Sequence, residues 1–213
     1  MRYFLDMSLI IYYCYRTGLD IEKKVIKFID EKGKNLFLVC YYILNENLPK
    51  WIKRMRIIFK EIKRKINNPE YELWSSPESK ILFKKDKING EKILKKYELT
   101  KNKKEFLEMI EEGWIYTEAR IKIFLRDLID EKVIPVNEID FELKSVLFTF
   151  LNNISDAMTL ASGIQEHNKK ELILITTDKE HWTKDNLEWA LPEHSAVKRK
   201  YPKIPEIKYI QHL

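Results

Sequence analysis

The chain has 213 residues, a hydrophobic content of 45%, a charged content of 34% and a formal net charge of +6. This composition is typical of one folded domain, and five glycines without a glycine-rich phosphate-binding motif argue against a nucleotide fold of the dinucleotide or P-loop type. Cys14 and Cys40 stand apart in apolar runs, and no uncharged run reaches about 20 residues, so we expect buried thiols, no membrane span and a cytoplasmic protein.

The amino-terminal part of the chain predicts two strands that enclose two helices. Tyr3–Leu5 is a short apolar run, residues 8–15 fit a helix packed under a sheet, and Asp20 suits the N-cap of a second helix. The apolar run 36–42 has the length of a buried parallel strand. Glu46 is expected just beyond this strand or in the first turn of the next helix.

A mostly helical insertion is expected at about residues 50–115. A basic helix over 49–65 is followed by a polar stretch, for which we expect short helices and loops up to residue 104. Two further helices are expected at 106–110 and 117–129.

The last third of the chain predicts strands and helices in alternation. Pro135 favours an edge position for the first strand, and Ser155 suits the N-cap of the second helix. The segment from about 183 to 213 is interpreted as a C-terminal extension. The expected elements are a short strand at 133–136, helices over 138–152 and from 155 onward, a buried strand at 172–175 and a final strand at 207–210.

The alternation of strands and helices predicts an α/β fold with three layers, α/β/α, around a mainly parallel central sheet. Residues 1–213 are interpreted as a single domain of this kind, which carries the helical insertion and the C-terminal extension. The sequence contains no internal repeat and no low-complexity linker that would indicate a second domain.

Four acidic residues lie where predicted strands end or predicted helices begin: Asp6, Glu46, Asp156 and Asp178. In a parallel sheet these positions meet at one edge, where open α/β folds bind their ligands. Carboxylates gathered there repel one another and need a cation, for which Mg²⁺ or Mn²⁺ is the expected choice and phosphodiester chemistry the expected reaction. Each acid taken alone also suits a helix cap or a turn.

Two hydroxyl groups lie close in sequence to these acids. Ser8 follows Asp6 by two residues, and Thr176 precedes Asp178 by two. We expect both to orient the carboxylates by hydrogen bonds without touching the metal, although Ser8 suits a helix cap equally well. The four histidines, at 167, 181, 194 and 212, have polar neighbours and are expected on the surface.

This set of residues resembles the motif pattern of the PIN-domain (PilT N-terminus) nucleases, a family that includes the toxin ribonucleases of toxin–antitoxin pairs and RNA-processing enzymes. The match covers roughly residues 1–48 and 115–182. It departs from the family in the insertion and in Trp182, which follows the last acid by four residues, where the family often has an aromatic residue after three. The matching segments are Asp6-Met7-Ser8, Glu46 after Cys40, Asp156 with Ala161, and Thr176-Thr177-Asp178.

The resemblance implies a PIN-like fold and a metal-dependent endoribonuclease that hydrolyses the phosphodiester bonds of RNA. The four acids would be catalytic and hold one or two Mg²⁺ or Mn²⁺ ions, which activate a water and offset charge on the phosphate. The substrate would be single-stranded RNA, and an antitoxin is a partner to expect in such a family. Two alternatives stay open, a non-catalytic RNA-binding or scaffold protein on the same fold and a metal-dependent DNA nuclease.

The basic surplus lies in one section of the sequence. Residues 50–104 contain 18 Lys and Arg against 7 Asp and Glu, a surplus of +11, so the other residues carry −5. The helix over 49–65 could follow RNA phosphates, with Trp51 and Trp74 stacked on unpaired bases; otherwise its charges form a solvated face and the tryptophans belong to the core. The section would also suit an acidic partner or a second subunit in a homodimer. The residues predicted to bind nucleic acid are Lys50, Lys53, Arg54, Arg56, Lys60, Lys63 and Arg64.

Overall fold

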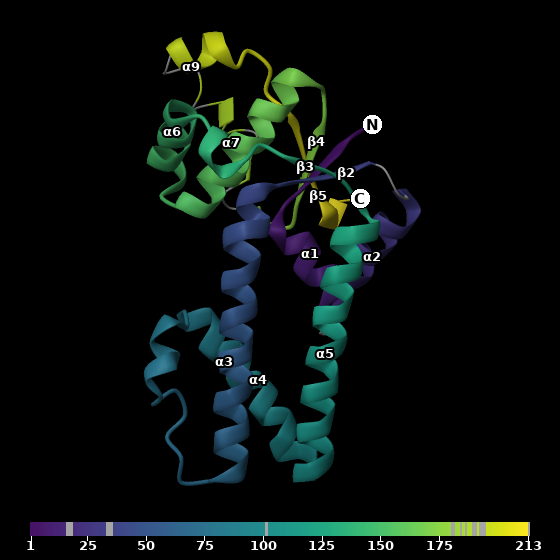
Figure 1. Cartoon of the computed structure of the whole chain (residues 1–213), viewed down its shortest axis with the longest axis vertical. Helices are drawn as coiled ribbons and strands as arrows, with labels where there is room; N and C mark the ends of the chain where they lie inside the picture. The colour runs from purple at the N-terminus through teal and green to yellow at the C-terminus, as the bar shows by residue number, and fades with distance from the viewer. Residues whose placement is uncertain are drawn as a thin grey trace. The chain divides into compact units, whose positions relative to one another are not determined.

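The computed structural model describes residues 1–15, 19–32, 36–100, 102–179, 182–183, 185, 187–188, 191 and 195–212 (Figure 1). The chain divides into two compact units, one made of Met1–Asn47 with Thr117–Leu213 and one made of Leu48–Tyr116. The second unit is helical, and its bounds lie close to residues 50 and 115, between which the sequence predicts the insertion. Within the described ranges, no helix is long and apolar enough to cross a membrane.

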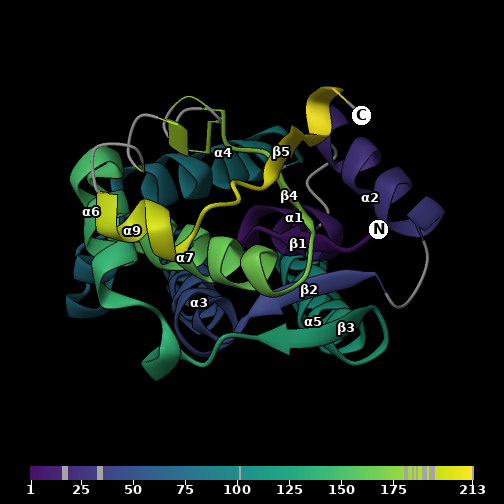
Figure 2. The same ribbon diagram turned by 90° about the horizontal axis from the view of Figure 1, so that it is seen from above.

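A parallel sheet of five strands forms the centre of the first unit, in the order β3-β2-β1-β4-β5 (Figure 2). The strands are β1 (Tyr3–Leu5), β2 (Phe37–Cys40), β3 (Ile129–Val133), β4 (Ile173–Thr176) and β5 (Glu206–Tyr209). The chain builds outward from β1 to β3, returns to the centre, and then adds β4 and β5 on the other side of β1. The α/β class and the parallel sheet are therefore confirmed.

Helices cover both faces of this sheet. The ring of Tyr3 meets that of Phe28, in α2 (Asp20–Lys32), edge to face at 5.4 Å. The next residue, Phe4, lies beside α7 (Ile154–Lys169), because a Cβ added at Gly163 would come within 3.5 Å of its ring. Successive side chains of a strand point to opposite faces, so α2 and α7 lie on opposite sides of the sheet. This arrangement is compatible with three α/β/α layers.

The other helices of the first unit complete these layers. The ring of Tyr13 in α1 (Met7–Cys14) packs against Phe124 of α5 (Lys103–Asp127) at 5.2 Å. The guanidinium of Arg120 donates to the carbonyl oxygen of Cys14 at 3.2 Å, so the last turns of α5 pack on α1. Shorter elements are the π-helical η1 (Ile43–Asn47), the 3-10 helices η3 (Val136–Glu138) and η4 (Ile210–His212), and the helices α6 (Phe141–Leu151) and α9 (Ser195–Lys200).

The second unit consists of α3 (Leu48–Asn67), the 3-10 helix η2 (Pro77–Ile81), α4 (Lys84–Thr100) and the first part of α5. Aromatic rings contribute to its packing, with Trp51 and Phe59 of α3 at 6.0 and 5.4 Å from the ring of Trp114. Glu61 is fully buried and accepts hydrogen bonds from Arg64, from the hydroxyl of Tyr71 and from the backbone N–H of Trp74. Burial alone would raise the pKa of Glu61, but these and other hydrogen bonds outweigh it and lower the pKa, so the carboxylate stays charged and anchors the loop after α3.

Several predictions about helices of the insertion are wrong. Helix α5 is one continuous helix rather than two, and Thr117 and Arg120 lie inside it rather than at a helix start. Gly113 does not break it, because one glycine in a helix interior costs only about 1 kcal/mol. Residues 84–100, expected as short helices and loops, form one helix of 17 residues.

Elements near the end of the insertion are shifted from their expected positions. Strand β3 ends at Val133, where the sequence predicts a strand to begin, and Ile134 follows with a positive φ of 51°. Helix α6 begins at Phe141 rather than 138, because the side chain of Asp140 accepts a hydrogen bond from Leu143 N and caps it. The predicted strand over 133–136 is therefore absent and Pro135 lies outside β3, but β3 itself is an edge strand, since it pairs only on its β2 side within the described sheet.

Two further expectations about single residues are corrected, and one is confirmed. Asn153 rather than Ser155 caps α7, since its side chain accepts from the N–H groups of Ser155 and Asp156. His167 is 7% exposed, with Nδ1 at 3.0 Å from the carbonyl oxygen of Leu172, so it is a core residue. Cys14 and Cys40 are buried free thiols, as predicted. Residues 181 and 194 lie outside the described residues.

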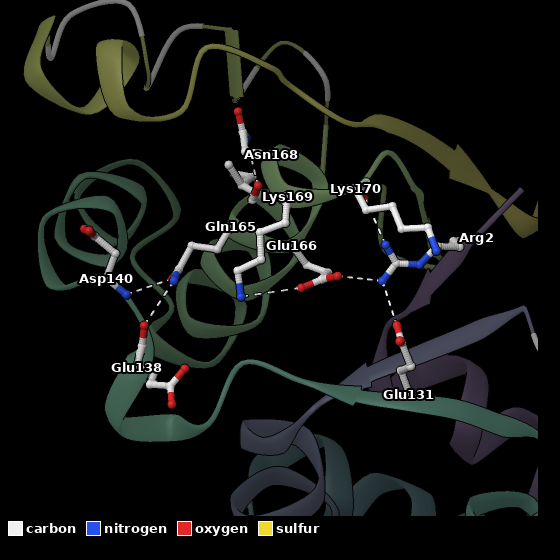
Figure 3. Close-up of polar contacts among 10 residues, drawn as sticks. Arg2, Glu131, Glu138, Asp140, Gln165, Glu166, Asn168, Lys169 and Lys170 are labelled. Carbon is white, nitrogen blue, oxygen red and sulfur yellow. Dashed lines mark hydrogen bonds and ion pairs between the residues drawn. The ribbon is translucent and has the colours of Figure 1, made fainter.

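The amino end of the sheet is held by Arg2 (Figure 3). One guanidinium nitrogen lies 2.9 Å from Glu131 of β3 and 2.6 Å from Glu166 of α7, and another donates to the carbonyl oxygen of Lys170 at 3.2 Å. The side chains of Arg2 and Glu166 are 12% and 11% exposed, so this pair is largely removed from water. It fastens the start of β1 to α7 and to the edge strand.

Candidate functional site

The strand order directs attention to the carboxyl ends of β1 and β4. These strands are neighbours, and the direction in which strands are added reverses between them. In open α/β sheets such a reversal leaves a crevice at the carboxyl ends, where ligands bind. Asp6 follows β1 directly, and Asp178 follows the last residue of β4 by two positions.

Asp6 is held by two hydroxyl groups that bind the same carboxylate oxygen. The hydroxyl of Ser8 donates to Oδ2 at 2.6 Å, and the hydroxyl of Thr176 donates to it at 3.0 Å. The backbone N–H of Asp6 continues the sheet by donating to Ile175 at 3.1 Å. Ser8 therefore faces the carboxylate of Asp6, and Asp6 occupies the N-cap position of α1 without a side-chain capping bond.

Thr176 connects the two acids through a single hydroxyl group. Its Oγ1 accepts the backbone N–H of Asp178 at 3.0 Å while it donates to Asp6, and its side chain is fully buried. Burial raises the pKa of Asp6, the charge of Asp178 adds to this, and hydrogen bonds from Ser8, Thr176 and Met7 offset it only in part. A bound cation would offset the charge that Asp178 adds beside the carboxylate of Asp6.

Asp156 lies in the first turn of α7, and both of its carboxylate oxygens have donors. The side-chain amide of Asn153 donates to Oδ2 at 2.5 Å, and the indole N–H of Trp182 donates to Oδ1 at 3.3 Å. Trp182 is fully buried. Because α7 leads directly into β4, the helix runs antiparallel to the strands and begins at their carboxyl edge. The N-cap and the indole together fix the carboxylate there.

Tyr209 of β5 links this arrangement back to the first pair of acids. Its hydroxyl donates to the carbonyl oxygen of Trp182 at 2.7 Å. Burial raises the pKa of Tyr209, and the charges of Asp185 and Asp178 raise it further, so its hydroxyl stays protonated beside them. The predicted C-terminal extension thus supplies Tyr209. Its hydroxyl bonds to Trp182, which holds Asp156, and its pKa responds to the charge of Asp178.

Glu46 lies in η1, which follows β2 at the same edge. Its neighbour Asn47 accepts a hydrogen bond from the hydroxyl of Ser155 at 2.8 Å. This bond ties η1 to the first turn of α7, the turn that carries Asp156. Glu46 is therefore carried on a segment that adjoins the other acids.

The acids share an edge but do not converge on one point. Among the described residues, no group of three or more His, Cys, Asp or Glu side chains is placed to hold a metal ion. The structure brings Asp6 and Asp178 together through Thr176, and it places Asp156 and Glu46 on adjoining segments. Carboxylate oxygens are the donors that Mg²⁺ and Mn²⁺ prefer, so the chemistry of this set fits such a cation.

An open depression lies elsewhere in the first unit, beside the edge strand β3. Its volume is about 550 Å³, and it contains none of the four acids. Side chains of both signs line it, and one of them, Glu166, is already paired with Arg2. The lining residues are Tyr41, Asp130, Glu131, Lys132, Val133, Ile134, Glu166 and Lys169.

The basic helix α3 offers fewer available cations than its sequence suggests. Arg54 pairs with Asp86 at 2.9 Å, and its side chain is only 15% exposed. Lys60, Lys63 and Arg64 each lie within 4.0 Å of a glutamate, at Glu78, Glu111 and Glu61 respectively. Lys50, Lys53 and Arg56 are exposed.

The two tryptophans proposed for base stacking belong to the packing of the second unit. Trp51 is 8% exposed and contacts Trp114, so the core interpretation is the correct one for it. Trp74 is partly buried against Gly90, where an added Cβ would meet its ring at 2.4 Å. Neither ring stands out as a surface for an unpaired base.

A scan against models of protein families, a search of curated proteins and a search of solved structures find no match to this sequence or fold.

Proposed function

We propose that this chain is a PIN-like, metal-dependent endoribonuclease that hydrolyses phosphodiester bonds of single-stranded RNA. The observation that carries the proposal is the bridged pair at the strand reversal, Asp6 and Asp178, joined by the hydroxyl of Thr176. Such a pair raises the energy of its own negative charge, and a bound cation would lower that energy.

The residues of this edge divide into ligands and supports. Asp6 and Asp178, with Asp156 and Glu46 beside them, would hold Mg²⁺ or Mn²⁺. When bound, the cation would supply an activated water and offset the charge that grows on the phosphate and the leaving oxygen. Ser8 and Thr176 fix the rotamer of Asp6, and the indole of Trp182 fixes that of Asp156.

The cellular setting and the partners follow from the same proposal. Two buried free thiols suit a reducing compartment, so we place the enzyme in the cytoplasm. An antitoxin-like inhibitor or a second subunit is the protein partner that this proposal predicts.

Cleavage of end-labelled RNA tests the proposal. Single-stranded RNA and DNA of matched sequence are incubated with the protein and Mn²⁺, Mg²⁺ or EDTA. We expect metal-dependent cutting of RNA that Asp178→Asn and Asp156→Asn abolish, and that Asp130→Asn, which removes an exposed acid of β3, leaves intact. RNA binding without cutting in any metal would refute the nuclease and favour a scaffold, and preferential cutting of DNA would favour a DNA nuclease.

A further inference from the structure

An exposed aromatic ring stands in the second unit, directly before α4. Phe83 is 63% exposed, although neighbouring Leu82 is buried. The guanidinium carbon of Arg54 lies over the ring, 4.6 Å from its centroid. Because the guanidinium covers one face, the large exposed fraction must include the other face.

The carboxylate of Asp86 contacts both the guanidinium of Arg54 and the backbone N–H of Phe83. One oxygen of Asp86, Oδ2, lies 2.9 Å from Nε of Arg54 and accepts the backbone N–H of Phe83 at 3.0 Å. The side chains of Arg54 and Asp86 are 15% and 13% exposed, so this pair is well shielded from water. One carboxylate therefore holds the backbone of Phe83 and lies beside the guanidinium that covers its ring, which limits the motion lost when a ligand binds there.

Lysines flank Phe83 on both sides in the sequence. Lys80, Lys84 and Lys85 are exposed and lie within three residues of it, in the section that carries the surplus of +11. Lysines of this kind bind phosphates without regard to sequence. A flat ring face next to such lysines matches a ligand with both phosphates and flat unpaired bases.

We propose that Phe83 is a stacking platform for an unpaired base of single-stranded RNA. The choice of RNA rests on the proposed function, and the platform takes the role that the sequence assigned to Trp51 and Trp74. Stacking on an aromatic ring is available to every base, so the site would tolerate many sequences.

Binding of fluorescein-labelled single-stranded RNA, followed by anisotropy in EDTA, tests this site without cleavage. Loss of one base–aromatic stack is expected to weaken binding about tenfold in Phe83→Ala. Phe141→Ala is the matched control, because Phe141 is 72% exposed, has Lys144 4.4 Å from its ring centroid, and belongs to the other unit. Its affinity for RNA should equal that of the wild type.

Two more variants separate stacking from general apolar contact. Phe83→Trp keeps an aromatic face and should retain binding, with its fluorescence quenched by RNA. Phe83→Leu keeps apolar surface without a π face and should bind as weakly as Phe83→Ala. Circular dichroism on each variant confirms that the second unit is folded.

Wild-type affinity in both Phe83→Ala and Phe83→Leu would overturn the proposal, and so would a wild-type protein that binds no single-stranded RNA. The assay contains no metal, so it is independent of the nuclease. A protein that binds RNA through Phe83 but never cuts it would refute the proposed function alone. A protein that cuts RNA and loses no affinity in Phe83→Ala would refute the platform alone.

Discussion

The negative charge of Asp6 lowers the free energy of unfolding of the protein. Burial and the charge of Asp178 raise its pKa, so the native state holds the proton more tightly than the unfolded chain. For an acid with a raised folded pKa, stability falls as pH rises from the usual value of about 4 through the raised one. Asp6→Asn removes this cost and keeps an oxygen for Ser8 and Thr176. We expect a higher Tm than the wild type at pH 7 and a smaller difference near pH 3.

The same thermal measurements test the link to metal binding. A cation that binds only the native state raises Tm, so Mn²⁺ should raise that of the wild type and leave Asp6→Asn almost unchanged. Asp130→Asn serves as the control, since this acid is exposed on β3. A lower Tm in Asp6→Asn at neutral pH would show that the hydrogen bonds to the carboxylate outweigh its desolvation.

Arg2 gives a prediction about stability at the opposite end of the sheet. Arg2→Ala leaves Glu166 largely buried without its nearest cation, and breaking such a pair is expected to cost about 2 kcal/mol. Lys169→Ala removes a more distant partner of the same glutamate, 3.7 Å away and 61% exposed, and should cost less than about 1 kcal/mol. Urea denaturation of the two variants measures both values. Equal losses would show that Arg2 acts only as a surface charge.

Sequence and structure agree best where a site residue adjoins a strand end. Asp6, Ser8 and Thr176 are each within three residues of β1 or β4, so a correct strand prediction places them. Tyr209 and Asn153 were not predicted. Tyr209 reaches the site only because β5 pairs with β4, and Asn153 precedes a helix start that the sequence assigns to Ser155.

At the scale of elements, two helical glycines have opposite surroundings. A Cβ at Gly90 of α4 would meet the ring of Trp74 at 2.4 Å, whereas a Cβ at Gly113 of α5 has nothing within 4 Å. Alanine is the better helix former by about 1 kcal/mol, so Gly113→Ala should stabilise the protein by about that amount. In Gly90→Ala overpacking outweighs this gain, and a net loss of about 1 kcal/mol is expected. Equal shifts in denaturant midpoint would show that α4 is free to move away from Trp74.

The elements that the sequence misplaces share a physical cause. In α5 the sequence predicts separate helices at 106–110 and 117–129, but glutamate is a good helix former and the helix continues through Glu111, Glu112 and Gly113. Strand β3 has three exposed charged residues in succession, so it shows no apolar alternation and is fixed by its pairing with β2. The local sequence pattern therefore predicts a helix or strand correctly only where tertiary contacts favour the same structure.

At the scale of the whole molecule, the sequence predicts the class of fold but not the order of the strands. Periodicity identifies β1, β2 and β4 as buried segments, yet nothing in it shows that β4 lies beside β1. The site prediction does not use the strand order, because it depends only on the shared carboxyl edge of a parallel sheet. The separation of charge is simpler, since the section 50–104 with its surplus of +11 is visible in the sequence and lies inside the second unit, whose net charge is +7 because four further glutamates fall within its bounds.

This separation predicts how RNA binding depends on salt. Each phosphate contact to a single strand contributes about −0.7 to the slope of log affinity against log salt concentration, whereas stacking releases no counterions. The double variant Lys84→Ala/Lys85→Ala should therefore lose affinity and reduce the magnitude of the slope by about 1.4. Phe83→Ala should lose affinity at an unchanged slope.

Anisotropy titrations in EDTA at several salt concentrations measure both slopes, with Lys122→Ala/Lys132→Ala as the control. These two lysines are also exposed but belong to the first unit, which carries the acidic edge. Their removal should leave both affinity and slope close to wild type. If the control lowers the slope as much as Lys84→Ala/Lys85→Ala, RNA is attracted by the net charge of the whole chain, and the second unit is not its binding surface.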